Sequence, residues 1–312
     1  MIKYCKEPEL ESPDLICGWP GIGRIGTLAV DYIRRAVKAE ELGEIEPLDF
    51  FEPNKAIILN GLLNSLEFPS SKFYYRKTDK KDLLLFIAEE QPSNESAKIY
   101  AVGEKAYQLA NLVLDVAYKF KCRRIYTSGA AITQTHHTLP PRVWAVPNSE
   151  ELIDELKDYE NIVLMSDIEG RRGQGFIIGL NGLMLGAARK RNIQSICLMG
   201  EIPYYLQGSP WPYPKASMAV VKVLTHILGI DIDIRPLENM SGKVEETIDS
   251  FLQNLFESEA IPQQIRDQIR DSIEKMKSIN TSGPITKEDE RRIMGHIDEF
   301  FKKRKKGNEG AN

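Results

Sequence analysis

Short apolar runs alternate with segments of helical periodicity from the N-terminus to about Pro236. The runs are rich in Ile, Leu and Val and are bounded by Gly, Pro, Asn or Asp, as is usual for strands buried between helices. We predict strands at residues 15–17, 56–59, 72–76, 83–88, 124–127, 143–146, 162–165 and 195–199. The charged segment 78–82 separates two of these strands and predicts a hairpin at an edge of the sheet.

Between the strands, apolar side chains recur every three or four residues, which is typical of amphipathic helices. This spacing predicts helices at residues 99–120, 152–156, 180–191 and 214–228. Asn148 and Ser149 are predicted to cap the second helix, and Gly229 to end the last one. Strands that alternate with helices predict a mostly parallel sheet with helices on both faces.

After Pro236 the pattern contains amphipathic helices and no strands. Apolar positions predict three helices around residues 244–255, 265–276 and 293–301. We therefore predict an α/β domain over residues 1–236, a helical appendage over 237–306 and a disordered tail over 307–312.

Composition narrows the class of protein. The 312 residues are 42% hydrophobic and 28% charged, and the net charge of -4 favours neither nucleic acid nor acidic membranes as partners. No run is long enough to span a bilayer and the N-terminus has no apolar core of signal-peptide type, so we expect a cytoplasmic protein. The four cysteines are scattered without a C-x-x-C pair, which predicts no metal site.

A glycine-rich turn follows the first predicted buried strand. Gly21, Gly23 and Gly26 satisfy G-x-G-x-x-G, the pattern of dinucleotide-binding loops. Such a site also needs a second strand ending in an acidic residue about 20 positions later. Residues 40–47 are acidic but contain no apolar strand, and Trp19 and Pro20 occupy the approach to the turn. We interpret the glycines as packing residues, and a cofactor site at Gly21, Gly23 and Gly26 is the alternative.

The histidines offer no predicted catalytic group. His136 and His137 are adjacent, and in an extended backbone their side chains would face opposite ways. His226 and His296 have no Cys, Ser or second His at a useful spacing. We therefore predict no catalytic residue among them.

One polar loop follows the strand at 162–165, where ligands gather in α/β sheets. It contains Asp167 and Glu169 and then two arginines, Arg171 and Arg172. A Mg²⁺ or phosphate site there is an alternative to the simpler interpretation, an ordinary polar loop.

Aromatic side chains gather in one non-periodic, proline-rich segment. Tyr204, Tyr205, Trp211 and Tyr213 lie in it. Tyrosine and tryptophan are enriched at interface hot spots, so we predict a protein interface at these residues. The alternative, that the segment folds back over its own sheet, stays open.

Three segments together resemble the prokaryotic branch of the proteasome assembly chaperone 2 family: residues 18–23 (GWPGIG), 173–185 (GQGFIIGLNGLML) and 198–205 (LMGEIPYY). The resemblance implies a three-layer α/β/α sandwich similar to purine nucleoside phosphorylases, without an identified active site. It also implies homo-oligomers, and relatives that help proteasome α-subunits to assemble.

Two hypotheses follow. The first is a non-catalytic, homo-oligomeric assembly factor without a cofactor, whose partners are itself and proteasome α-subunits. The second is a small-molecule enzyme or sensor of ATP-grasp or phosphorylase-like type, which would bind a nucleotide, nucleoside or phosphate at residues 21–26, with residues 127–129 completing the pocket.

Overall fold

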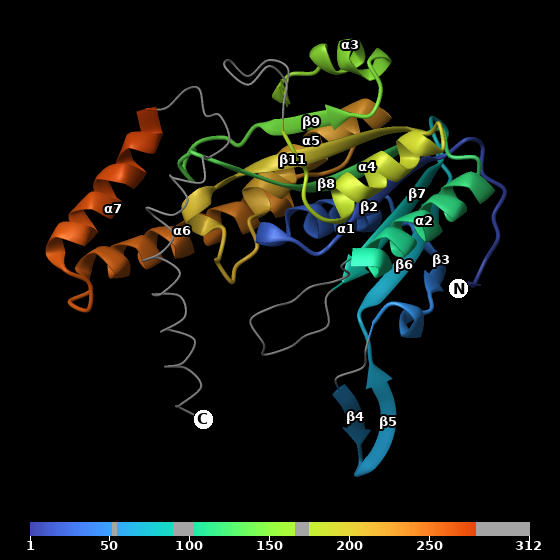
Figure 1. The fold of residues 1–312 in the computed structure, drawn as a ribbon, viewed down its shortest axis with the longest axis horizontal. Coiled ribbons are helices and arrows are strands. Elements are labelled where there is room, and N and C mark those ends of the chain that lie inside the picture. The colour runs from blue at the N-terminus through green and yellow to red at the C-terminus, as the bar shows by residue number, and fades with distance from the viewer. Residues whose placement is uncertain (52–54, 90–102, 166–174, 279–312) are drawn as a thin grey trace.

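The computed structural model describes residues 1–51, 55–89, 103–165 and 175–278 (Figure 1). Within them, nine strands form one sheet in the order β1-β3-β6-β7-β2-β8-β11-β9-β10. Their bounds are β1 Ile2–Tyr4, β2 Asp14–Gly18, β3 Glu40–Ile45, β6 Ser70–Arg76, β7 Leu83–Glu89, β8 Arg124–Thr133, β9 Val143–Pro147, β10 Ile162–Leu164 and β11 Gln194–Pro203. The central strands β7, β2, β8 and β11 are parallel, whereas β6 and β9 join this block in antiparallel orientation.

The sheet has helices on both faces, which confirms the three-layer α/β/α prediction. Helices α1 (Ile25–Ala36) and α5 (Pro214–Leu228) cover one face, and α2 (Gly103–Lys119) and α4 (Leu180–Lys190) cover the other (Figure 1). Alternate side chains of β2 enter opposite layers: Ile16 packs with α1, while Leu15 and Cys17 pack with α2 and α4. A strand buried on both faces needs an unbroken apolar run, as this one has.

The helix at Glu151–Lys157 (α3) begins without the predicted cap. Asn148 instead donates from its side-chain amide to the Ile193 carbonyl (2.8 Å) and accepts from the Ser195 amide (2.9 Å). The capping prediction is wrong because these bonds fasten the end of β9 to the start of β11.

The predicted hairpin of β6 and β7 is present, but it does not lie at an edge of the sheet, because β3 and β1 continue beyond β6. No apolar strand was expected in the acidic segment 40–47, yet residues 40–45 form strand β3. β6 and β7 separate β3 from β2, so β3 is not the neighbouring strand that a dinucleotide site requires.

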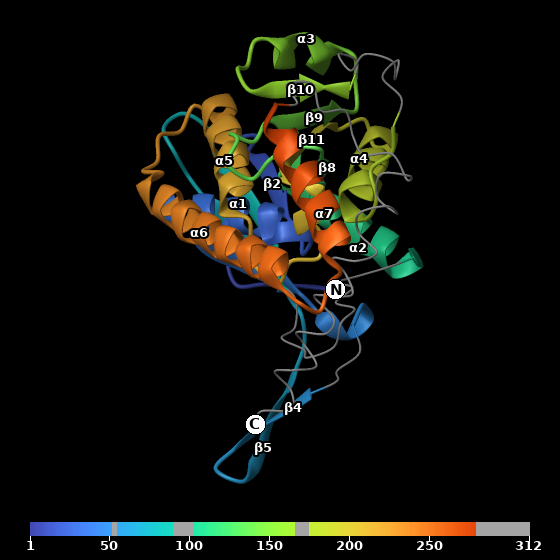
Figure 2. The same ribbon diagram turned by 90° about the vertical axis from the view of Figure 1, so that its left-hand side faces the viewer.

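Two helices follow the α/β layers, α6 (Arg235–Glu257) and α7 (Gln263–Lys275) (Figure 2). Leu237, Phe251 and Leu255 of α6 and Ile273 of α7 belong to the same hydrophobic core as α1 and α5. The third predicted helix and His296 lie outside the described residues. The division of the chain at residue 236 stays a prediction.

A second, two-stranded sheet stands apart from the large one. Its strands β4 (Lys55–Leu59) and β5 (Leu62–Glu67) form a hairpin that projects from the body in both views (Figures 1 and 2). The apolar run at 56–59 was predicted to be a buried strand; it is a strand, but its side chains are exposed. We call residues 55–67 the arm.

Short 3₁₀ turns complete the fold at Ile22–Arg24, Pro47–Asp49, Tyr204–Leu206 and Met276–Ser278. Among the described helices, none combines the length and the apolar character that crossing a membrane requires.

Candidate functional site

The glycine turn joins β2 to α1, and its glycines have different surroundings. A Cβ atom on Gly26 would lie 2.3 Å from the carbonyl oxygen of Ser128. Gly23 has a φ of 61°, and a Cβ there would lie 3.0 Å from both Ile202 Cδ1 and Tyr213 Cβ. Gly21 is exposed, and a Cβ there would meet nothing within 4 Å. Packing therefore explains Gly23 and Gly26 without a ligand, while a cofactor site at the three glycines stays untested.

Residues 127–129, the proposed remainder of a ligand pocket, lie within β8. The buried hydroxyl of Ser128 donates to the carbonyl oxygens of Cys17 (3.1 Å) and Gly26 (3.3 Å) as alternative partners. The first bond ties β8 to the end of β2, and the second ties β8 to the first turn of α1. The polar loop with Asp167, Glu169, Arg171 and Arg172 lies outside the described residues.

The aromatic segment packs against the glycine turn. The amide of Tyr213 donates to the Gly23 carbonyl (2.7 Å), and Tyr204, Tyr205 and Tyr213 are buried. Trp211 is half-buried and meets Phe251 of α6 edge-on, with 5.4 Å between ring centroids. In the single chain these side chains are thus mostly buried against its own core. An interface at this segment stays a prediction.

The adjacent histidines do not face opposite ways. The rings of His136 and His137 lie 4.2 Å apart, centroid to centroid, and both side chains are buried. The prediction assumed an extended backbone, but the chain turns here, since the Leu139 amide donates to the His136 carbonyl (3.0 Å). The turn brings both imidazoles to one side.

His137 links three elements. Its Nε2 lies 2.9 Å from Asp249 Oδ1 on α6, and its Nδ1 lies 2.7 Å from the Tyr205 hydroxyl. A carboxylate only accepts, so Nε2 carries a proton, and in neutral His137 the tyrosine hydroxyl donates to Nδ1. Lys215 of α5 donates to the His137 carbonyl (2.8 Å) and pairs with Glu245 of α6 (2.9 Å). These contacts hold α6 against the strand ends.

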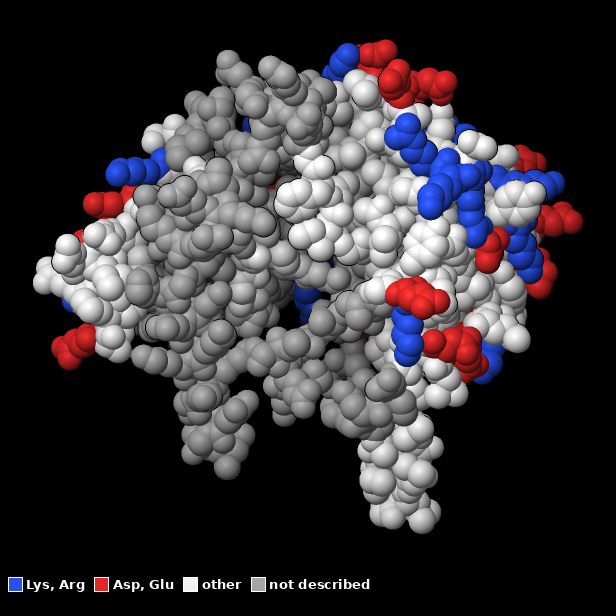
Figure 3. All heavy atoms as spheres, in the orientation of Figure 1, with Lys and Arg blue, Asp and Glu red and all other residues white. Residues whose placement is uncertain are grey.

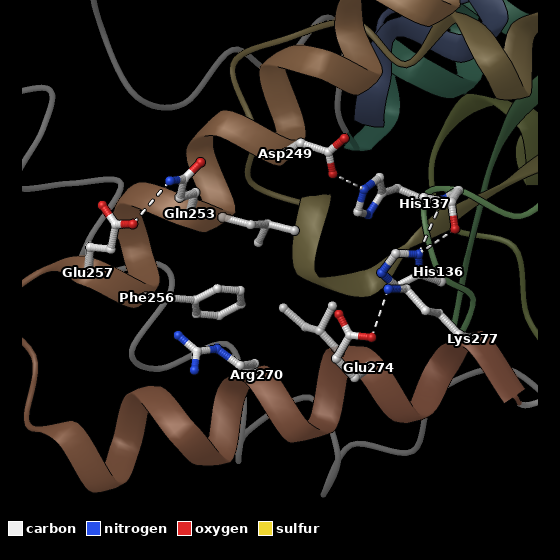
Figure 4. Close-up of a pocket in the computed structure, with 12 residues that line it drawn as sticks. His136, His137, Asp249, Gln253, Phe256, Glu257, Arg270, Glu274 and Lys277 are labelled. Carbon is white, nitrogen blue, oxygen red and sulfur yellow. Dashed lines mark hydrogen bonds and ion pairs between the residues drawn. The ribbon is translucent and has the colours of Figure 1, made fainter.

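His136 faces a cavity of about 270 Å³ between the histidine pair, α6 and α7 (Figure 4). Its Nδ1 accepts from the Thr138 amide (3.3 Å), so neutral His136 carries its proton on Nε2. Burial, reinforced by His137 and Lys277, lowers the pKa of His136 to about 4, against the opposing influence of Glu274 and Asp249. The residues that hold His137 lie 68, 78 and 112 positions further along the chain, which no local sequence pattern reveals.

The lowered pKa of His136 predicts that the stability of the fold depends on pH. Unfolded histidine titrates near 6.5, so between about pH 6.5 and 4 the unfolded chain takes up a proton that folded His136 refuses. Acidification from pH 7 to 5 therefore lowers the free energy of unfolding, and we expect about 1–2 kcal/mol more loss in the wild type than in His136→Asn. Urea unfolding at both pH values measures this difference, and parallel pH profiles would contradict it.

Among the described residues, exposed large apolar side chains are concentrated in the arm. Ile57, Ile58, Leu59, Leu62, Leu63 and Leu66 are 37% to 74% exposed. Residues 56–66 contain no charged side chain, and Figure 3 shows the tip free of charged groups. An isolated two-stranded hairpin is marginal in water, and exposed apolar patches mark interaction sites.

An apolar groove lies elsewhere on the surface. Its volume is about 900 Å³, and it runs between the start of α2, the end of β9 and α4. Phe176 and Ile178, which precede α4, line it and are 81% and 83% exposed. Arg189 is the one charged residue among the described residues that line it. Across the described residues, no cluster of three or more His, Cys, Asp or Glu side chains suits a metal ion.

Comparison with known proteins identifies relatives that cover most of the chain. An uncharacterised protein of Methanocaldococcus jannaschii is 28% identical over 243 residues, covering 78% of this chain and 84% of the relative. The crystal structure of Pyrococcus furiosus PbaB, an archaeal proteasome activator, matches with 28% identity and a TM-score of 0.64, over 80% of this chain and 98% of PbaB.

P. furiosus PbaA, an archaeal homologue of proteasome-assembly chaperone, shares the fold, with 22% identity and a TM-score of 0.59 over 88% of this chain and 98% of PbaA. The profile of the PAC2 family matches residues 15–252, which begin within β2, include the glycine turn and extend into α6. The chain therefore belongs to the PAC2 family.

Proposed function

We propose that this protein is a cytoplasmic, non-catalytic assembly factor that associates with itself and acts by binding proteasome α-subunits. Its membership of the PAC2 family supports this, as do its similarities to a proteasome activator and to a proteasome-assembly chaperone homologue. The observation that carries the proposal is the arm, because a projecting hairpin of exposed leucine and isoleucine gains stability when another protein covers it.

Self-association predicts a solution mass above that of one 35.4 kDa chain. We expect the pair Leu62→Asn and Leu63→Asn to weaken association by about a hundredfold or more, since covering one leucine contributes about 1.5–3 kcal/mol. Light scattering after gel filtration, over a dilution series, measures the mass. Asn64→Ser, on the same strand, is the matched control and should keep the wild-type mass. A wild type that is monomeric throughout would contradict self-association.

Binding to proteasome α-subunits is tested separately. The tagged protein is mixed with purified α-subunits, and the complex is sought by gel filtration. We expect co-elution and faster assembly of α-subunit rings in its presence. If a well-folded oligomer neither co-elutes with α-subunits nor speeds ring assembly, α-subunits are not its client. That result would not contradict self-association.

A further inference from the structure

We propose that the arm of one copy inserts into the apolar groove beside α4 of a second copy. This inference rests on the self-association half of the proposed function and adds the two surfaces that meet. The groove is defined by the end of β9, the start of α2, residues 175–179 and α4.

The arm has the form of an inserting element. Asn60 and Gly61 turn the chain sharply, with φ of 52° and 76°, the left-handed values of a tight two-residue hairpin. The tip is therefore only two strands wide, and its apolar side chains point to both faces of the ribbon. None of the described residues covers either face, so both are available to a groove that encloses them.

The groove matches the arm in chemistry. Leu183, Met199 and Val146 form part of its lining, and Ile178 and Phe176 stand exposed in it. Arg189, the one charged residue of the described lining, is exposed and therefore needs no partner on the arm. Residues 56–66 of the arm carry no charge, so their insertion between the described residues of the groove brings in no ion without a partner.

The arm cannot fill the groove of its own chain. In both views it points away from the body, while α4 and β9 lie on the body at a distance from its tip (Figures 1 and 2). Each copy therefore presents one arm and one groove, and the groove must be filled by the arm of another copy. Either a reciprocal pair of copies or a closed ring fills every groove with an arm.

Cross-linking between two kinds of molecule tests the inference. In a Cys5→Ser background, which removes the exposed native thiol, one preparation carries Leu63→Cys and another Ile178→Cys. Both positions are exposed, so neither change disturbs the core. The preparations are mixed, exchanged and treated with a short bismaleimide. We expect a product joining arm to groove, in about tenfold excess over that from Leu63→Cys mixed with Tyr118→Cys, an exposed position on α2.

The outcomes separate this inference from the proposed function. An oligomer whose Leu63→Cys preparation cross-links to itself, arm to arm, overturns the groove as the docking site and keeps self-association. The groove is also overturned as the docking site if the protein is oligomeric, no cross-link forms at the arm, and only added α-subunits protect the arm cysteine from the maleimide. The arm would then bind a client. A strictly monomeric protein overturns self-association itself. A dominant arm-to-groove product, lost on adding Leu62→Asn, supports the inference.

Discussion

Gly26→Ala is expected to destabilise the fold by about 3 kcal/mol or more, the upper range for overpacking. The new Cβ would lie 2.3 Å from the Ser128 carbonyl oxygen and 2.9 Å from its carbonyl carbon. These are backbone atoms of β8, which is paired on one side with β2 and on the other with β11, so the strand cannot move aside. The first turn of α1 would instead be pushed off the sheet. Urea unfolding followed by circular dichroism measures the loss.

Gly21→Ala is the matched control, and it separates packing from ligand binding. Its Cβ would meet nothing within 4 Å, and its φ of -178° is extended backbone that any residue adopts. We expect a change within about 0.5 kcal/mol. A nucleotide site would instead show a rise in melting temperature with ATP, NAD or phosphate that Gly21→Ala weakens. Equal losses from the two substitutions would contradict the packing interpretation.

Local signals were sufficient for the centre of the fold. Strand β2 was predictable because both of its faces are buried, which requires an unbroken apolar run. Helix α5 was predicted with its observed bounds, because Pro214 suits the first helical turn and Gly229 adopts the left-handed φ of 66° that ends it. Where the signals for burial and capping lie within the element itself, the sequence pattern is enough to predict that element.

The remaining features depend on distant parts of the chain. Strand β3 was missed because only Leu42, Gly43 and Ile45 of its six residues are buried, so its pattern is mainly charged. Residues 56–59 of the arm were mistaken for a core strand because an apolar run does not say what covers it. The contact between His137 and Asp249 joins residues 112 positions apart, and only the packing of α6 brings them together.

Arg142→Ala is expected to cost about 3–5 kcal/mol, because it leaves a buried carboxylate without its cation. Glu201, in the segment that carries the family resemblance, is 1% exposed on β11. It accepts from the Arg142 guanidinium (2.8 Å), the Trp144 indole (2.9 Å) and the Arg142 amide (3.0 Å). The cluster lies where β9 runs antiparallel to β11, so its loss also loosens this end of the sheet. Urea unfolding gives the magnitude.

Two further variants show that the cost comes from the buried charge. Arg191→Ala also breaks an ion pair of normal length (2.6 Å), but its partner Asp115 has a side chain 60% exposed, so we expect a loss of about 1 kcal/mol or less. Adding Glu201→Gln to Arg142→Ala should recover part of the stability, because a neutral amide costs less to bury than a lone carboxylate. If Arg142→Ala and Arg191→Ala lower the free energy of unfolding equally, the burial of Glu201 does not depend on its cation. The register of β9 against β11 would then rest on the backbone bonds and apolar packing alone.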